Sequence, residues 1–176
     1  MNSNLLEVSS LIMKFQGITA LDDVSFSLKQ GEITSLIGPN GAGKTTMFNC
    51  ITGMYTPTSG QVSFDGKDIT AAPAHQISKH GIARTFQNLA LFGGLSVLDN
   101  LIVGAYLQGR SGLIQGVFKT PQARAEQKAA EASAYEVLDF LGMQDAAHLK
   151  PSEMPYGRQK QVEFARALMQ KARLVM

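Results

Sequence analysis

Apolar and polar residues alternate along the first part of the chain in a way that predicts β-strands. Residues 5–14 read as one strand, and residues 24–28 (VSFSL) alternate as a half-buried one. Residues 33–37 (ITSLI) are largely apolar and predict a buried strand. Residues 61–69 (QVSFDGKDI) predict a short hairpin whose Asp-Gly pair forms the turn. Residues 14–21 are expected to connect the first two strands.

Farther along the chain, apolar residues recur at helical spacing. Residues 73–79 predict a short helix, and residues 97–106 predict a longer one. Ser96 is the expected cap of the longer helix, and Asp99 completes an S-x-x-D capping box three residues later.

Two more helices and two short strands are expected in the second half. One helix begins after the Thr-Pro pair at residues 120–121 and stops at Gly142, and residues 158–171 predict the other. The apolar stripe of the first of these helices consists of Ala123, Ala130, Ala134, Val137, Leu138 and Leu141. Such a stripe indicates core packing, not a binding site. Residues 82–87 and 174–176 predict short apolar strands.

The stretch that points to a function is the loop GPNGAGKTT at residues 38–46, which joins the strand predicted at residues 33–37 to a helix. It fits the pattern G-x-x-x-x-G-K-[ST] in the strand–loop–helix context that this pattern requires. Glycines allow the chain to turn with φ > 0, so that backbone N–H groups wrap a polyphosphate without obstruction by side chains. The positive end of the helix dipole faces the same place. The residues expected to bind the phosphates are Asn40, Gly41, Ala42, Gly43, Lys44, Thr45 and Thr46.

The side chains of this loop have separate expected roles. Lys44 supplies a point charge for the β- and γ-phosphates, the hydroxyl of Thr45 is the expected Mg²⁺ ligand, and Thr46 offers a second hydroxyl near the α- and β-phosphates. The alternative, a glycine-rich turn with an incidental lysine, is disfavoured because both flanks are correct. The loop therefore predicts binding of a polyphosphate, such as that of a nucleotide, together with Mg²⁺.

Composition limits the number of domains and argues against nucleic-acid binding, disulfides and a histidine metal site. A chain of 176 residues with 44% hydrophobic and 17% charged residues suits one domain, or one domain with a subdomain. The net charge of +2 is too small to argue for nucleic-acid binding. Cys50 is the only cysteine, so it forms no internal disulfide and is expected to be a small buried residue. The three histidines are scattered, so metal binding by them is not expected.

No stretch of the chain has the character of a targeting or membrane-spanning segment. The N-terminus lacks a basic region followed by an apolar core, so no signal peptide is expected. The most apolar window, residues 89–107, contains Asp99, Asn100 and several glycines, whereas a membrane span needs about 20 predominantly apolar residues. The chain is therefore not expected to cross a membrane.

The order of these pieces resembles the nucleotide-binding subunit of ABC transporters across essentially the whole chain. The resemblance implies an α/β P-loop NTPase (ABC ATPase) fold, with a nucleotide-binding β/α core and an N-terminal antiparallel β portion at residues 1–95. It implies a helical subdomain at residues 96–165, and the start of the Walker B strand region at residues 166–176.

The resemblance also assigns roles outside the loop. Phe15, in KFQGITALDDVSFSL, matches the aromatic residue that stacks on adenine, although the residues alone leave a core or edge aromatic equally open. Gln87, in GIARTFQ, falls where the family has its lid glutamine. That glutamine helps to hold Mg²⁺ and the attacking water, and it senses the transmembrane partner.

Residues 154–159 (MPYGRQ) lie where the family has its signature, usually Leu-Ser-Gly-Gly-Gln. Gly157 matches, but Pro155 stands at the usual serine, Tyr156 at the first glycine and Arg158 at the glutamine. The family uses this helix N-terminus to bind the γ-phosphate held by the opposite subunit. Pro155 has no hydroxyl to offer, whereas the Gly157 amide and the helix dipole still could bind the phosphate, and Arg158 could add charge.

The proline–tyrosine signature, together with GIARTFQNLALFGGLSVLDNL, is similar to the ATP-binding subunit of bacterial branched-chain amino-acid importers. This similarity implies ATP hydrolysis that drives import of a small solute. The implied partners are a second ATP-binding subunit, transmembrane permease subunits docked near Gln87 and, indirectly, a solute-binding protein, with no nucleic acid. The implied location is peripheral, on the cytoplasmic face of the inner membrane.

The family also has residues that this sequence does not show. An Asp that orders Mg²⁺ and a Glu that activates water follow the family's apolar strand, but no Asp or Glu follows Leu174 here, so we expect the chain to be truncated before the Walker B carboxylates. We therefore expect the chain of residues 1–176 to hydrolyse ATP very poorly. The strand of the phosphate loop would also lack its parallel neighbours, and we expect such a chain to be prone to aggregation.

Three alternatives remain open. An ABC ATPase could serve another cargo, such as lipid export, and co-purifying membrane partners would decide. A non-hydrolysing nucleotide-binding module would bind ATP without turnover. A P-loop kinase or GTPase is disfavoured because the segments of Gln87 and Gly157 have no role there and no guanine-specific motif is visible.

Overall fold

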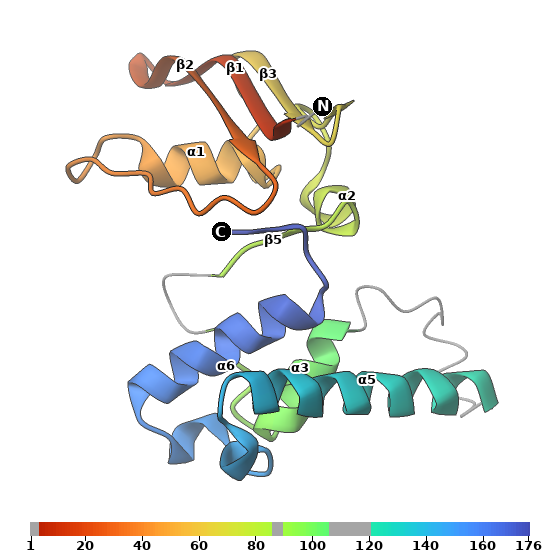
Figure 1. Cartoon of the computed structure of the whole chain (residues 1–176). Coiled ribbons are helices and arrows are strands. Elements are labelled where there is room, and N and C mark those ends of the chain that lie inside the picture. Colours follow the sequence, from red (N-terminus) through yellow and green to blue (C-terminus); the bar gives the residue numbers. More distant parts are fainter. Residues whose placement is uncertain (1–3, 86–89, 106–120) are drawn as a thin grey trace. The chain divides into compact units, whose positions relative to one another are not determined.

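The structure is a computed structural model that describes residues 4–85, 90–105 and 121–176, apart from the side chains of Pro121 and Ala123 (Figure 1). The chain divides into two compact units, Met1–Ile82 and Ala83–Met176. The first unit contains the phosphate loop, and the second contains the longer helices. The domain boundaries predicted after residues 95 and 165 stay predictions.

The first unit is built on an antiparallel sheet with the strand order β2-β1-β3-β4. Its strands are β1 (Asn4–Phe15), β2 (Ile18–Lys29), β3 (Ser59–Phe64) and β4 (Lys67–Asp68), and its helices are α1 (Lys44–Ile51) and α2 (Ala74–Lys79). β1 is a central strand, which pairs with β2 on one side and with β3 on the other. The predicted antiparallel β portion is confirmed.

Both hairpins of this sheet turn through pairs of residues with positive φ. Gln16 and Gly17 have φ of 39° and 93°, and Asp65 and Gly66 have φ of 52° and 73°. Such pairs form type I′ turns, whose twist matches that of the flanking antiparallel strands. The Asp65-Gly66 turn is as predicted. The connection predicted over residues 14–21 is wrong, because the two strands continue up to the Gln16-Gly17 turn.

Residues 33–37 do not form the buried strand that their apolar character predicts. Ile33 is 101% exposed, Ile37 is 88% exposed, and none of the five residues pairs with a strand in the described part of the chain. A strand is held in a sheet by a ladder of hydrogen bonds to a neighbour. Among the described residues no strand offers these five positions such a ladder, so their apolar side chains alone do not make them a strand.

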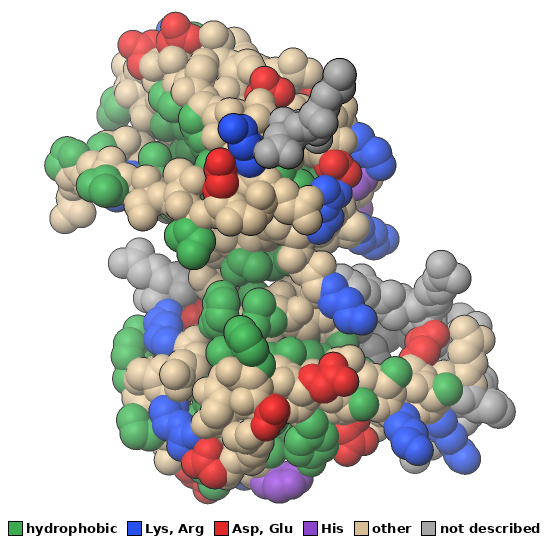
Figure 2. Space-filling view, viewed as in Figure 1, with side chains coloured by type: hydrophobic (Ala, Val, Ile, Leu, Met, Phe, Trp, Pro, Cys, Tyr) green, Lys and Arg blue, Asp and Glu red, His purple; other side chains and the backbone are tan. Residues whose placement is uncertain are grey.

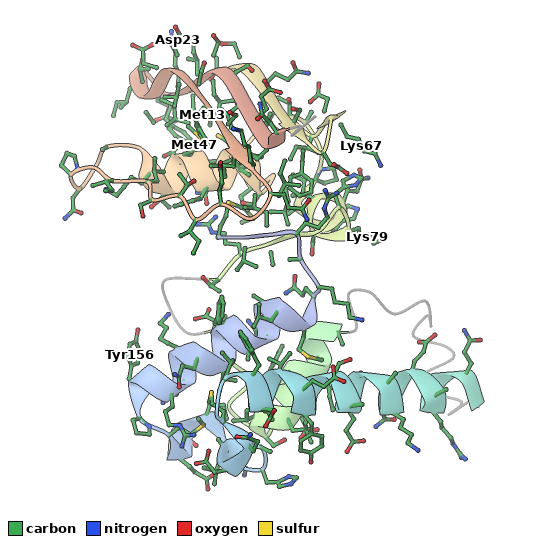
Figure 3. The ribbon with its side chains drawn as sticks, viewed as in Figure 1. Met13, Asp23, Met47, Lys67, Lys79 and Tyr156 are labelled. Carbon is green, nitrogen blue, oxygen red and sulfur yellow. The ribbon has the colours of Figure 1, made fainter. Side chains whose placement is uncertain are left out.

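α1 covers one face of the sheet of the first unit (Figure 1). Its buried side chains include Met47 and Cys50, which are 2% and 1% exposed. Met13 of β1 and Met47 lie in the layer between the sheet and the helix (Figure 3). Cys50 is thus the small buried residue that the sequence predicts.

The second unit is organised around α3 (Val97–Ala105), α5 (Pro121–Phe140) and α6 (Tyr156–Met169). α3 packs against both α5 and α6 (Figure 1). The 3-10 turns η2 (Gln144–Ala146) and η3 (Pro151–Glu153) lie between α5 and α6, and β5 (Ile82–Ala83) pairs with β6 (Leu174–Val175). The core consists of Val97, Leu98, Leu101, Ala134, Leu138, Met143, Ala146, Ala147, Met154, Val162, Ala165 and Met169. The predicted helices are confirmed. Of the strand predicted at residues 82–87, Ile82 and Ala83 are in a strand, Arg84 and Thr85 are not, and residues 86 and 87 lie outside the described residues.

α3 begins with the cap that the sequence predicts. The Oγ of Ser96 accepts the N–H of Asp99 at 3.1 Å and donates to the Asp99 carboxylate at 2.6 Å. Asn100 is fully buried, and its side-chain oxygen accepts the N–H of Phe92 at 2.8 Å. Its side-chain NH₂ donates to the carbonyls of Phe92 and Ser96 at 3.1 and 2.9 Å. The first turn of α3 therefore fixes the segment that precedes it.

The surface carries mixed charge. Basic and acidic side chains are interspersed on the face shown in Figure 2. This is the solvated surface expected from a net charge of +2. Within the described ranges, no helix has both the length and the apolar character needed to span a bilayer.

Candidate functional site

The phosphate loop at residues 38–46 leads into α1 through glycines with positive φ. Gly41 has φ of 85° and Gly43 has φ of 81°, a region that other residues rarely adopt. Gly43 also lies against β2, because a Cβ at this position would be 2.4 Å from the carbonyl oxygen of Ala20. A Cβ at Gly41 would meet nothing within 4 Å. The loop is therefore anchored to the sheet at Gly43 and open at Gly41.

Backbone N–H groups at the start of α1 are available to an anion. The first helical hydrogen bond runs from the N–H of Met47 to the carbonyl of Gly43, at 2.8 Å. The N–H groups of Lys44, Thr45 and Thr46 have no partner within the helix. In the described part of the chain they have none outside it either. Together with the positive end of the helix dipole, they form the kind of site that binds phosphate.

Lys44 is folded over the loop. Its Nζ donates to the carbonyl oxygens of Gly38 and Pro39, both at 2.6 Å. The loop also closes on itself through the N–H of Ala42, which donates to the Pro39 carbonyl at 3.2 Å. The ammonium group is therefore held by carbonyls at the start of the loop. An incoming phosphate would replace neutral carbonyl acceptors with a charged one, which makes a stronger bond.

The hydroxyls that follow Lys44 differ in exposure, since Thr45 is exposed and Thr46 is half-buried. Thr45 is thus free to bind a cation together with phosphate oxygens. The described residues contain no group of three or more His, Cys, Asp or Glu side chains that could hold a metal ion by themselves. A threonine hydroxyl beside phosphate oxygens suits Mg²⁺, which keeps several waters and is held through phosphates with one or two protein ligands.

Phe15 lies at the end of β1, next to the Gln16-Gly17 turn, and is 37% exposed. Its ring meets the ring of Tyr55 edge-on, with the centroids 5.3 Å apart and the planes at 75°. The sequence motifs point to Phe15 alone. The only signal for Tyr55 is an aromatic residue inside a turn of Gly, Pro, Ser and Thr, and sequence cannot place that turn beside β1.

The register of the first hairpin relates Phe15 to the phosphate loop. Gly43 contacts the backbone of Ala20, and Phe15 pairs with Ile18 on the same strand. Ala20 and Ile18 are two residues apart, which is about 7 Å along a strand. The aromatic pair and the phosphate loop thus lie along one stretch of β2, within the first unit.

The signature-like segment lies at the start of α6. Pro155 is the residue before the helix, and no side chain caps this end. Gly157 is exposed, and a Cβ there would meet nothing within 4 Å. Tyr156 is 62% exposed and projects from this end of the helix (Figure 3). The N-terminus of α6 is therefore open to solvent, as the predicted role of Gly157 requires.

Arg158 is paired within the chain. Its guanidinium makes a two-pronged contact with the carboxylate of Asp145, at 2.6 and 2.8 Å. The hydrogen bond from Arg158 lowers the pKa of Asp145, and the same bond raises the pKa of Arg158. The charge that Arg158 was expected to add at the signature is thus largely directed at Asp145. Gln87 lies outside the described residues, so its predicted role stays a prediction.

Comparison with known proteins relates the chain to one family. A family model described as ABC transporter matches residues 21–176. Two relatives align over the whole chain and over 69% of their own length. They are the high-affinity branched-chain amino acid transport ATP-binding proteins BraF of Pseudomonas aeruginosa, 38% identical, and LivG of Escherichia coli, 40% identical.

Solved structures show the same fold. A nucleotide-free ATP-binding cassette from an ABC transporter is 35% identical, with a TM-score of 0.81 over 98% of this chain and 68% of that one. The ADP conformation of an ABC transporter cassette is 33% identical, with a TM-score of 0.82 over 98% of this chain and 67% of that one. With the P-loop, the antiparallel sheet and the helical unit in place, these matches show that the chain belongs to the ABC transporter family.

Proposed function

We propose that the chain is the ATP-binding subunit of a transporter that couples ATP binding and hydrolysis to the import of branched-chain amino acids. The observation that most directly supports ATP binding is the phosphate loop, where the first N–H groups of α1 have no partner among the described residues and the ammonium of Lys44 is held by loop carbonyls. Phe15 lies on the β1–β2 hairpin, which Gly43 of the loop contacts at Ala20, and it offers an aromatic ring for a base. Phosphate recognition and base recognition are thus combined in one unit.

The loop residues take separate roles in this proposal. The backbone from Asn40 through Gly43 wraps the phosphates, and Lys44 leaves its carbonyl acceptors for the β- and γ-phosphates. Thr45 binds Mg²⁺, and Thr46 lies near the α- and β-phosphates. The Mg²⁺ ion supplies charge neutralisation at the β- and γ-oxygens when it is bound.

The remaining predicted roles depend on other chains. The open N-terminus of α6, with the Gly157 amide, receives the γ-phosphate held by a second ATP-binding subunit. Gln87 connects the nucleotide to the transmembrane permease subunits. A solute-binding protein delivers the amino acid to the permease. The named relatives support this cargo, because both are branched-chain amino acid transport proteins.

Nucleotide binding is tested by titrating the chain with ATP and Mg²⁺ in a calorimeter. Lys44→Ala is expected to weaken ATP binding by at least tenfold, because each charge-assisted hydrogen bond is worth about 1.5–3 kcal/mol. Lys67→Ala is the matched control, since Lys67 is an exposed lysine of the same unit on β4. Equal ATP affinity in wild type and Lys44→Ala would contradict the proposed phosphate site.

The cargo is tested in the cells that encode the protein. Lys44→Ala on the chromosome is expected to lower the uptake of labelled leucine, isoleucine and valine, and to leave the uptake of an unrelated solute unchanged. Normal uptake of all three amino acids in that strain would refute the proposal that they are the cargo. Co-purification of the chain with permeases for another solute, or with a lipid exporter, would identify a different cargo.

A further inference from the structure

Tyr55 contacts the aromatic ring that the proposed function assigns to the nucleotide base. The ring centroids of Phe15 and Tyr55 are 5.3 Å apart, with an angle of 75° between the planes. This edge-to-face arrangement is a favourable geometry for an aromatic pair. Phe15 is 37% exposed and Tyr55 is 38% exposed, so the pair lies at the surface of the first unit and is not part of its core.

The backbone around Tyr55 is fixed independently of this ring contact. The N–H groups of Met54 and Tyr55 both donate to the carbonyl of Asn49 in α1, at 2.9 and 3.1 Å. Gly53 precedes them with φ of 69°, and a Cβ there would lie 2.4 Å from the carbonyl oxygen of Ala72. The turn that carries Tyr55 is therefore anchored to the end of α1.

The other end of this turn is tied to β1. The N–H of Thr58 donates to the carbonyl of Ile12 at 2.9 Å, and the hydroxyl of Thr58 accepts the N–H of Lys14 at 3.0 Å. Lys14 is the residue immediately before Phe15. The same turn thus fixes the backbone next to Phe15 and brings the Tyr55 ring against the Phe15 ring.

Phe15 is in contact with Tyr55 and is still 37% exposed, so part of its surface remains accessible to a ligand. Stacking on a protein aromatic is favourable for any base, because every base has a π-face. Stacking is most effective when the aromatic ring is already in its bound orientation, since no side-chain freedom is then lost on binding. Without Tyr55, the exposed Phe15 side chain would sample several rotamers.

We propose that Tyr55 is a positioning residue for the base of the bound nucleotide, because its ring contacts that of Phe15 while Phe15 stays partly exposed. This inference rests on the proposed function, since it requires a nucleotide at the phosphate loop. It assigns to the turn after α1 a role in binding the base, separate from the role of the loop before α1 in binding the phosphates.

The test compares a ligand that has a base with one that lacks it. ATP and inorganic tripolyphosphate, each with Mg²⁺, are titrated into wild type and into Tyr55→Ala. Tyr55→Ala is expected to weaken ATP binding roughly 3- to 10-fold, the range expected from an aromatic pair. Its affinity for tripolyphosphate is expected to stay within about twofold of wild type, because the phosphate loop is untouched.

Three further variants make the comparison specific. Tyr55→Phe keeps the aromatic ring and is expected to bind ATP like wild type. Tyr55→Leu keeps apolar volume without an aromatic ring and is expected to behave like Tyr55→Ala, which also guards against a folding defect of the alanine variant. Met54→Ala changes the neighbouring residue, which is 59% exposed, and is expected to leave both ligands unaffected.

The possible results separate this inference from the proposed function. If wild type binds ATP through Lys44 but Tyr55→Ala and Tyr55→Leu bind it equally well, the role of Tyr55 is refuted and the phosphate site stands. If these variants lose ATP and tripolyphosphate to the same extent, Tyr55 is merely structural and the inference is also refuted. If wild type binds neither ligand, the proposed function itself fails.

Discussion

Gly43→Ala is expected to damage the phosphate loop more than Gly41→Ala does, although both residues have nearly the same backbone conformation. Their φ angles are 81° and 85°. In each variant the left-handed conformation brings the alanine Cβ close to the following carbonyl oxygen, which costs about 1–2 kcal/mol of stability. The two positions differ in their surroundings. A Cβ at Gly43 would lie 2.4 Å from the carbonyl oxygen of Ala20, whereas a Cβ at Gly41 would meet nothing within 4 Å.

The clash at Gly43 involves backbone atoms, which cannot move aside as the end of a flexible side chain can. Overpacking of this kind adds about 1–3 kcal/mol. We therefore expect Gly41→Ala to lower the free energy of unfolding by about 1–2 kcal/mol and Gly43→Ala by about 2–5 kcal/mol. Both variants reduce the freedom of the unfolded chain equally, so this effect cancels in the comparison.

Urea unfolding followed by circular dichroism measures these differences in the absence of nucleotide. The midpoint of Gly43→Ala should lie below that of Gly41→Ala, with similar slopes. Equal midpoints for the two variants would refute the argument, because they would mean that the loop moves away from Ala20 without loss of stability. The affinities of Gly41→Ala and Gly43→Ala for tripolyphosphate can then be compared as well, since Gly41 lies where the loop is open to a ligand.

Three further changes test the second unit by urea unfolding. Gly104→Ala is expected to lower the free energy of unfolding by about 1–3 kcal/mol, because a Cβ at Gly104 would lie 2.7 Å from the carbonyl oxygen of Arg166 where α3 meets α6; unchanged stability would show that the helices separate freely. Asn100→Leu is expected to lower it by about 1–3 kcal/mol, because the N–H of Phe92 loses its acceptor; the opposite sign would count against the role of Asn100. Asp145→Asn is expected to reduce the loss of unfolding free energy that occurs as the pH falls below about 4. The pKa of Asp145 is lowered in the folded protein, so its contribution is present above the unfolded value of about 3.9 and is lost as the pH falls through the folded value; parallel profiles below about pH 4 would contradict this.

Features encoded by neighbouring residues were predictable from the sequence. The capping pair of Ser96 and Asp99 and the Asp65-Gly66 turn both occur as expected. The glycine turn of the phosphate loop and the helix that begins at Lys44 belong to the same group, because Gly41, Gly43 and α1 lie within one loop–helix segment. In each case the residues that determine the geometry lie within a few positions of one another, so no knowledge of the tertiary fold is needed.

Features that depend on distant partners were not predictable in this way. The contact of Tyr55 with Phe15 joins residues 40 positions apart, in a turn that Asn49 holds to α1 and Thr58 holds to β1. The pair of Arg158 and Asp145 likewise joins α6 to η2. Residues 33–37 show the converse, since their composition predicts a strand but the described residues offer no neighbouring strand to form the ladder.

The burial of Cys50 provides a chemical reporter for the helix that carries the phosphate loop. Cys50 is the only thiol in the chain, it is 1% exposed, and burial raises its pKa, so it should react slowly with alkylating reagents in the folded protein. Its sulfur becomes accessible when α1 detaches from the sheet, so the rate of alkylation follows the opening equilibrium of that helix. A ligand at the N-terminus of α1 would shift this equilibrium toward the closed form. The native protein therefore contains its own label for occupancy of the loop, which requires no added fluorophore and no engineered residue.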